Sequence, residues 1–356
     1  MKTLKRTWAD ISLDNLEYNY RSIRAHLPQG TKFLGVMKAD AYGHGAVPVS
    51  RALADLGAEY LAVSNLEEAV QIRRGEVRLP ILILGYTPAE YAANMIFLDI
   101  TQEVHSLEYA RELNEALAGT NYILNVHLKL DTGMTRIGFF AYDNERTLDE
   151  LRQVAQLPHL HIEGAFMHFC VADSRAEADV SFTKLQYKRF MDMLSAMAGV
   201  GIRPEIRHCC NSGATILYPE FALDMVRPGI ITYGNAPSDE LEGALSLRPM
   251  MSLHSMIAQV RTVPAGTDIS YGRLYRTKEE TRVAVLPIGY ADGLSRLLTG
   301  KASFYLQGHQ VPVIGRICMD MCMIDVSNVP EAKPGDVVTI FGYDDDGTLL
   351  PCERLA

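Results

Sequence analysis

The feature that most constrains the fold is an alternation of short apolar runs with amphipathic helical patterns, which continues to about residue 230. The apolar runs have the composition of buried strands and lie at Phe33–Met37, Tyr60–Val63, Ile81–Leu84, Ile96–Ile100, Ile123–Leu130, Ile162–Met167, Ile206–His208 and Ala222–Val226. Helical patterns lie between most of them, at Val47–Leu56, Leu66–Arg74, Ser106–Leu117 and Thr183–Met197. Eight such units in about 220 residues predict a (β/α)8 TIM barrel with a parallel sheet. An open doubly wound sheet fits less well, because its G-x-G-x-x-G fingerprint is absent from the sequence.

The two ends of the sequence have a different pattern of residues. The opening TWADISL alternates like a short strand, and a helical pattern follows Asp14. After Gly234, short strands punctuated by glycine and proline are expected at Leu253–Val263, Thr281–Pro287, Ser303–Leu306, Gln310–Ile314, Met321–Val326 and Val337–Phe341. These runs predict a mostly-β C-terminal domain. The boundary is expected near residues 235–245, where NAPSDELEGA is small and polar.

Charge and cysteine content exclude several classes of protein. With 34 basic and 43 acidic residues the net charge is −9, and no basic run offers a surface for nucleic acid or an anionic membrane. A small-molecule substrate is therefore expected. The start MKTLKRTWAD lacks the apolar core of a secretion signal, and no later run is long enough to span a membrane, so we expect a cytoplasmic protein. The six cysteines form no C-x-x-C pair, so free thiols and no metal site are expected.

Polar residues that follow barrel strands are the first candidates for chemistry, because active sites of this fold lie at the carboxyl ends of the strands. The first strand ends in FLGVMKADAYGHG, which places Lys38 at the barrel mouth. A solvated loop lysine, or one paired with Asp40, is the simpler alternative. The fifth strand ends in LKLDTGMTRIGF, with Lys129, Asp131 and Arg136, which could equally form a charged rim. The sixth contributes His168, for which a hydrogen-bonded core histidine is the ordinary explanation.

The last two barrel strands offer a site for a phosphate. The seventh runs into RHCCNSGAT, where Ser212 lies at a helix start, although a plain helix cap would explain the same residues. The eighth runs into MVRPGIITYG, with Arg227 before a turn and the backbone amides of Gly229 and Ile230 after it. A lysine, further cations, a histidine and a phosphate nest at one barrel mouth suit pyridoxal phosphate. A metal-dependent hydrolase or a phosphosugar enzyme on the same scaffold stays open at this point.

The motifs together resemble those of one known family. VMKADAYGHG, LKLDTGMTRIGF, HFCVAD, CCNSGAT, MVRPGIITYG, DISYGRLY, LPIGYADG and GRICMDMCMIDV resemble the motifs of alanine racemases, in the same order, from about Trp8 to Phe341. The resemblance implies that pyridoxal phosphate is carried by Lys38 and that Tyr271 is the second catalytic base. It further implies the following roles: Tyr42, Ser212, Gly229 and Ile230 at the phosphate, Arg227 at the pyridine nitrogen, and His168 between Arg227 and Tyr271.

Other positions follow from the same resemblance. It implies Arg136 and the amide of Met319 as contacts of the substrate carboxylate, Tyr290 and Arg316 at the entrance, and Lys129 as a lysine that is often carbamylated. Physical chemistry agrees with the proposed role of Arg227, because a guanidinium donates to a pyridine nitrogen without readily protonating it. Racemisation also needs one base on each face of the reacting carbon.

The resemblance also implies a domain division, an assembly and a biological role. An N-terminal strand at residues 1–12 would join the β domain, the barrel would cover 13–238, and the β domain would cover 239–356. The family works as a homodimer whose active sites are shared between subunits, and it supplies D-alanine for peptidoglycan. Its members normally continue for a few tens of residues past the position of Ala356, with a tyrosine at the cofactor phosphate. The alternatives are a serine or broad-specificity racemase and a non-catalytic pyridoxal-phosphate-binding protein. A decarboxylase fits less well, because Arg227 stands where those enzymes have an acid.

Overall fold

The protein is described from a computed structural model, which covers residues 5–142 and 144–355. It divides into two compact units, one running from Leu13 to Arg248 and the other combining the residues up to Ser12 with those from Pro249 onward. This division falls after Arg248, a few residues beyond the range of 235–245 that the composition indicates. In the described ranges, no helix combines the length and apolar character that crossing a bilayer requires.

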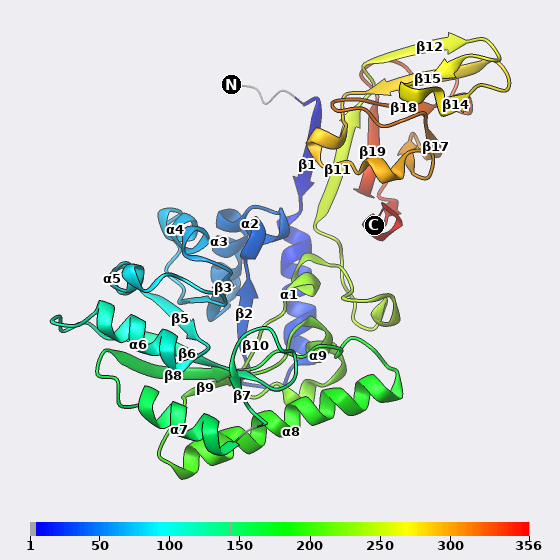
Figure 1. Ribbon diagram of the computed structural model, residues 1–356. Coiled ribbons are helices and arrows are strands. Elements are labelled where there is room, and N and C mark those ends of the chain that lie inside the picture. Colours follow the sequence, from blue (N-terminus) through cyan, green and yellow to red (C-terminus); the bar gives the residue numbers. More distant parts are fainter. Residues whose placement is uncertain (1–4, 143, 356) are drawn as a thin grey trace. The chain divides into compact units, whose positions relative to one another are not determined.

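The first unit contains a parallel sheet with the strand order β10-β2-β3-β4-β5-β6-β8-β9 (Figure 1). Its strands are β2 (Lys32–Val36), β3 (Tyr60–Val63), β4 (Ile81–Ile83), β5 (Ile100–Val104), β6 (Leu124–Asp131), β8 (Leu160–Phe166), β9 (Ile206–His208) and β10 (Met225–Val226), with the short β7 (Phe139–Phe140) beside β6. The ring closes between β9 and β10 through backbone bonds from Asp224 to Arg207 and from Arg227 to Cys210. The predicted (β/α)8 barrel is therefore confirmed.

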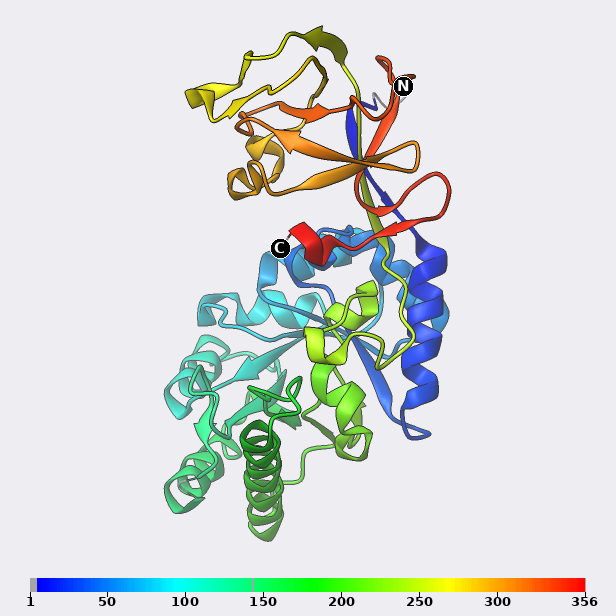
Figure 2. The ribbon, with the colours of Figure 1, turned by 90° about the vertical axis from the view of Figure 1, so that its right-hand side faces the viewer.

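Helices follow the strands and lie outside them, as Figures 1 and 2 show. They are α1 (Leu13–His26), α2 (Lys38–Tyr42), α3 (Ala46–Leu56), α4 (Leu66–Arg74), α5 (Ala92–Phe97), α6 (Leu107–Ala116), α7 (Asn144–Val154), α8 (Glu177–Gly199) and α9 (Ser212–Leu217). Asn65 and Ser106 cap α4 and α6 with their side chains, which explains where these two helices begin. The strand expected at Ile96–Ile100 was wrong in its position, because Ile96 and Phe97 end α5 and the strand begins at Ile100.

The second unit is mostly β structure. Its strands are β1 (Thr7–Ile11), β11 (Met251–Met256), β12 (Gln259–Val263), β13 (Asp268–Ile269), β14 (Tyr275–Arg276), β15 (Thr281–Leu286), β16 (Ser303–Leu306), β17 (His309–Ile314), β18 (Cys322–Asp325), β19 (Val337–Tyr343) and β20 (Leu349–Leu350). The N-terminal strand β1 pairs antiparallel with β11. The single strand expected at Leu253–Val263 is two strands, because the chain leaves the sheet at Ile257 and Ala258.

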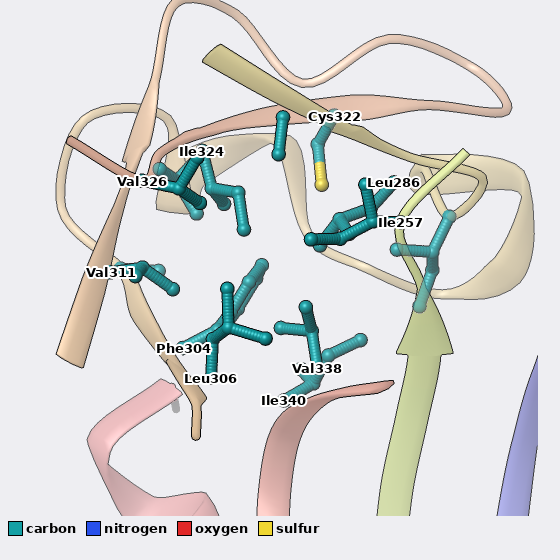
Figure 3. Close-up of a cluster of buried hydrophobic side chains, with 14 of the residues drawn as sticks. Ile257, Leu286, Phe304, Leu306, Val311, Cys322, Ile324, Val326, Val338 and Ile340 are labelled. Carbon is teal, nitrogen blue, oxygen red and sulfur yellow. The ribbon is translucent and has the colours of Figure 1, made fainter. Parts of the chain in front are cut away.

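The β unit has its own hydrophobic core, which Figure 3 shows. Phe304, Ile324 and Ile340 are fully buried there and come from three different strands, β16, β18 and β19. Buried and half-buried residues alternate along β16 and β18, which is the period-two pattern of a strand with one buried face, whereas β19 buries three consecutive residues. This core accounts for the ability of the second unit to pack by itself.

Candidate active site

The predicted residues of the barrel unit gather at the carboxyl ends of its strands. Lys38 follows β2 after one residue, His168 follows β8 after one residue, and Arg227 follows β10 directly. Ser212 begins α9 just beyond β9. Because the strands are parallel, all four residues lie at one end of the barrel, which is the end where enzymes of this fold carry their active sites.

Gly229 forms the floor of a small polar cradle. Its backbone N–H donates a hydrogen bond of 2.9 Å to the hydroxyl of Ser212. A Cβ atom placed on Gly229 would lie 2.8 Å from the hydroxyl oxygen of Tyr42 and 3.7 Å from that of Ser212. The N–H of Ile230, the next residue, donates no hydrogen bond to the described part of the chain. Two hydroxyls and two backbone amides therefore converge, which is a suitable environment for the oxygens of a phosphate.

Arg227 is a buried cation with 3% of its surface exposed. Its terminal nitrogens donate to His208 Nδ1 at 3.0 Å, to the carbonyl of Met167 at 2.8 Å and to the carbonyl of Cys209 at 3.2 Å, and Nη2 lies 3.4 Å from His168 Nδ1. These contacts leave Nε available to donate elsewhere. The guanidinium is thereby held in place, while Nε–H and the second N–H of Nη1 donate to no described group.

The charge of Arg227 has no adjacent counter-ion. The pKa of this guanidinium is lowered to about 10, mainly by burial and to a smaller extent by the nearby Arg136, while the thiols of Cys209 and Cys210 oppose the shift. Among the described residues, no carboxylate forms a salt bridge with Arg227. A neutral acceptor such as a pyridine nitrogen would meet its free donor without an added proton.

His168 is held as a neutral imidazole. Burial lowers the pKa of His168 well below its usual value, and the positive charges of Arg227, Arg136, Lys129 and Lys38 lower it further. Nδ1 of His168 lies 3.4 Å from Nη2 of Arg227, which can only donate, so this contact favours the tautomer with the ring proton on Nε2. The alternative of an ordinary core histidine does not explain why four cations surround this ring.

Lys129 is buried against the aromatic ring of Phe166, with Nζ 5.5 Å from the ring centre. Its amine donates to the carbonyl of Leu130 at 3.1 Å. The pKa of Lys129 is lowered to about 8, mainly by burial and also by the positive charges of Arg227 and Arg136, while Asp131 opposes the shift. A sizeable fraction of this amine is therefore neutral near pH 8, and the neutral amine is the form that reacts with CO₂.

Asp131, which could have belonged to a charged rim, instead organises the loop that leads to Arg136. One oxygen of its buried carboxylate accepts the backbone N–H groups of Gly133, Met134 and Thr135 at 3.0 to 3.1 Å. Arg136 itself is exposed. The loop is thus fixed by backbone bonds while its arginine stays available to an anionic ligand.

The segment α2 after Lys38 is a left-handed turn that the sequence did not predict. Ala39, Asp40, Ala41 and Tyr42 have φ values of 52° to 55°. A left-handed conformation costs roughly 1–2 kcal/mol for each residue other than glycine. Four such residues in succession therefore store strain directly beside a candidate site residue, where backbone strain is commonly found.

Two carboxylates hold this turn, one from α4 and one from the turn itself. Glu68 accepts the N–H of Ala39 at 2.7 Å, and Asp40 accepts the N–H of Ala46 at 2.8 Å. Asp40 forms no salt bridge with Lys38, so the simple ion-pair alternative for this lysine does not apply. The ammonium of Lys38 lies 5.7 Å from the centre of the Tyr42 ring, which brings the lysine to the polar cradle.

The remaining candidates belong to the β unit. Tyr271 and Met319 line one cavity of about 630 Å³, together with Arg261, Val263, Thr267, Asp268, Ile269, Ser270, Val283, Val285, Cys318, Asp320, Met321 and Met323. Tyr271 is 68% exposed and Met319 is 55% exposed. The N–H of Met319 donates no hydrogen bond within the described ranges, whereas its carbonyl accepts the N–H of Ala291. Tyr271 and Met319 thus offer a phenol and a backbone donor on the same surface.

The two predicted entrance residues lie on loops beside that cavity. Tyr290 begins a 3₁₀ helix, is 45% exposed and donates its N–H to the carbonyl of Cys318 at 3.1 Å. Arg316 is half-buried, and its backbone carbonyl accepts a hydrogen bond of 2.6 Å from the hydroxyl of Ser270. The segments that contain Tyr271, Tyr290, Arg316 and Met319 are therefore connected to one another within the β unit.

Comparisons with known proteins cover almost the whole chain. Residues 11–237 match the family described as "Alanine racemase, N-terminal domain", and residues 250–356 match "Alanine racemase, C-terminal domain". The alanine racemase of Desulfovibrio desulfuricans is 46% identical over 349 residues, which cover 98% of this chain and 91% of that protein. The alanine racemase of Clostridium tetani is 42% identical and covers 99% of this chain and 90% of its own length.

Solved structures agree with the sequence comparison. The alanine racemase of Clostridium difficile 630 superposes with a TM-score of 0.93 at 39% identity, and the match covers 100% of this chain and 90% of that one. The alanine racemase of Bacillus anthracis with bound L-Ala-P has a TM-score of 0.91 at 33% identity, with the same coverage. The likeness therefore extends over both units of the chain.

Proposed function

The chain belongs to the alanine racemase family, and on that premise we propose that it interconverts L- and D-alanine with Lys38 and Tyr271 as opposed bases. The family depends on pyridoxal phosphate. The observation that carries the proposal is the polar cradle at Gly229, which lies beside Lys38 at a barrel mouth whose buried arginine lacks a counter-ion. A lysine, a phosphate nest and a donor for the ring nitrogen are three groups that suit this cofactor.

We assign the cofactor contacts as follows. Tyr42, Ser212 and the amides of Gly229 and Ile230 would hold the phosphate, Arg227 would donate from Nε to the ring nitrogen, and Lys38 would carry the group covalently. When bound, pyridoxal phosphate supplies an electron sink that acidifies the α-hydrogen of the amino acid. Arg227 limits that sink, because a guanidinium does not give up its proton, and a less stabilised carbanion has less time for side reactions.

The proton transfers are assigned to two side chains on opposite faces of the reacting carbon. Nζ of Lys38 would take or return the α-proton on one face, and the phenol oxygen of Tyr271 would do so on the other. A free tyrosine titrates near 10, so Tyr271 needs nearby positive charge to act as a base. The neutral His168, with its Nε2–H directed away from Arg227, is suited to relay that field. Binding the substrate carboxylate is assigned to Arg136 and the amide of Met319, with Tyr290 and Arg316 at the entrance.

Each active site is proposed to need two copies of the chain. Tyr271 and Met319 are exposed on the β unit, and the cofactor candidates belong to the barrel unit. In a two-fold homodimer, the β unit of one subunit would complete the barrel site of its partner. We also propose that Lys129 is carbamylated, because its partly neutral buried amine lies among cations that a carbamate would compensate. The enzyme would act in the cytoplasm and supply D-alanine for peptidoglycan.

Purified protein tests this proposal directly. The holoenzyme is expected to show the absorbance of a lysine-bound pyridoxal group and to convert L-alanine into a racemic mixture in a chiral assay. Parallel rates with L-serine measure whether the pocket prefers the smaller side chain. Cofactor absorbance without loss of optical activity in either amino acid would instead indicate a non-catalytic cofactor-binding protein.

A further inference from the structure

A chain of polar side chains crosses the interior of the barrel, which is otherwise apolar. The apolar part consists of Leu34, Val36, Tyr60, Ala62, Leu82, Ile206 and Met225. Among these residues run His127 and His208, both fully buried, which connect Arg227 at the carboxyl end of the strands to Glu163. Burying two imidazoles in an apolar core is costly unless every nitrogen has a partner.

The hydrogen bonds of this chain have only one consistent direction. Arg227 can only donate, so His208 accepts at Nδ1 and carries its proton on Nε2. That proton is then donated to Nδ1 of His127 over 2.8 Å, and His127 in turn donates from Nε2 to the carboxylate of Glu163 over 3.0 Å. Both rings are thus fixed in the same tautomer, and neither can accept a second proton without breaking a bond.

Glu163 is held as an anion at the other end of the chain. Its Oε2 accepts from Tyr60 at 2.8 Å and lies 3.3 Å from the hydroxyl of Thr101, in addition to its bond from His127. Burial would raise the pKa of this carboxyl group, but the hydrogen bonds from His127, Tyr60 and Thr101 lower it below the usual range. A carboxylate with several donors is strongly favoured over the neutral acid.

The backbone is shaped to admit this chain. The pairing of β6 with β8 changes register so that Val126 opposes Ile162 while His127 opposes Gly164, which makes Glu163 the extra residue of a bulge. A Cβ atom on Gly164 would lie 2.5 Å from the ring of His127. Because of the bulge, Glu163 supplies the carboxylate, and the next residue, Gly164, leaves room for the imidazole of His127.

Aromatic packing fixes the end of the polar side-chain series that lies at His208 and Arg227. The ring of Phe166 stacks on His208 with a centroid distance of 5.0 Å and an angle of 8°. The guanidinium of Arg227 lies 5.4 Å from the centre of the same ring. His208 and Arg227 are consequently held against one surface, so a change in the imidazole would be transmitted to the guanidinium.

From this geometry we propose that Glu163 is a positioning residue, which fixes the tautomers of His127 and His208 and thereby orients Arg227. The chain also gives Arg227 a counter-charge at a distance, since the positive end and the negative end are separated by two neutral rings. A direct carboxylate would bind the guanidinium and occupy its donors. The relayed arrangement leaves Nε free. This inference rests on the proposed function in so far as Arg227 faces the cofactor.

The test uses Glu163→Gln, which keeps an acceptor but removes the charge, with Asp224→Asn as the matched control. Asp224 is a half-buried carboxylate paired with Arg207 at 2.7 Å. Among the described residues, its carboxylate forms no hydrogen bond with Glu163, His127, His208 or Arg227. Magic-angle-spinning ¹⁵N NMR of histidine-labelled holoenzyme reports the tautomers, with resonances assigned from His127→Asn and His208→Asn proteins. Steady-state kinetics with alanine and the thermal midpoint are measured on the same samples.

Wild-type protein is expected to carry the protons of His127 and His208 on Nε2, with both Nδ1 atoms unprotonated. Glu163→Gln is expected to shift both histidine resonances and to lower kcat about tenfold with little change in KM, because a hydrogen bond to a charged group is weakened. Asp224→Asn should lower the thermal midpoint and leave resonances and kcat unchanged. An Nδ1 proton on either ring of the wild type, unchanged kcat in Glu163→Gln, or an equal loss of kcat in Asp224→Asn would overturn the inference. Wild-type protein with the expected tautomers but no racemase activity would refute the proposed function instead.

Discussion

Replacing Gly229 with alanine should weaken cofactor binding without harming the fold. The backbone of Gly229 has a φ of −101° and a ψ of −97°, and the largest effect expected of an alanine there is the contact made by its added Cβ atom. That atom would lie 2.8 Å from the Tyr42 hydroxyl, closer than real Cβ contacts, so the hydroxyl must move away from the cradle. Burial raises the pKa of Tyr42, which keeps the phenol protonated and therefore a donor.

The expected loss is one hydrogen bond to a charged phosphate, which is worth about 1.5–3 kcal/mol. The dissociation constant of pyridoxal phosphate should therefore rise about ten- to hundredfold, as measured by titrating the apoenzyme and following absorbance. The control is Gly199→Ala near the end of α8, where an added Cβ meets nothing within 4 Å. Unchanged affinity in Gly229→Ala, or an equal loss in Gly199→Ala, would refute the assignment of the cradle to the phosphate.

Three further predictions concern the barrel mouth. Ala39→Gly should raise the thermal midpoint by a few degrees, because glycine removes a strain of about 1–2 kcal/mol, whereas Ala39→Val should lower it. The ¹³C carbamate signal from labelled bicarbonate should grow as the pH rises through about 8, where the Lys129 amine loses its proton, and should vanish in Lys129→Arg; a signal that does not change with pH would contradict the lowered pKa. Borohydride reduction and peptide mapping should find the pyridoxyl group on Lys38, and finding it on Lys129 or Lys32 would refute that assignment.

Much of the barrel was predictable because strands such as β2, β3 and β4 are buried on both faces and are almost entirely apolar. The helix at Leu66–Arg74 was predicted at its exact bounds, since its cap and its amphipathic period agree. The segment around Ile96 was misassigned because an apolar run of this length does not distinguish the end of a helix from the start of a strand.

Other parts of the candidate site left no signal in the sequence. Ala39 and Ala41 have no preference for left-handed torsions, so nothing in KADAY indicates the turn that follows Lys38. The contact of His127 with His208 joins residues that are 81 positions apart, and it depends on strand register and on a bulge. Side chains alternate between the inside and the outside of a barrel along each strand, which indicates that His127 and His208 could both point inward. This pattern is informative only once the barrel is known.

The proposed active site takes its two bases from different subunits, and subunit mixing tests this arrangement. Lys38→Ala and Tyr271→Phe proteins should each be nearly inactive as homodimers. After equal amounts have exchanged subunits, half of the dimers are mixed and each has one intact site, so activity should return to about a quarter of the wild-type value. No recovery, with mixed dimers confirmed by mass, would contradict the shared site and show that both bases come from one chain or that one is misassigned.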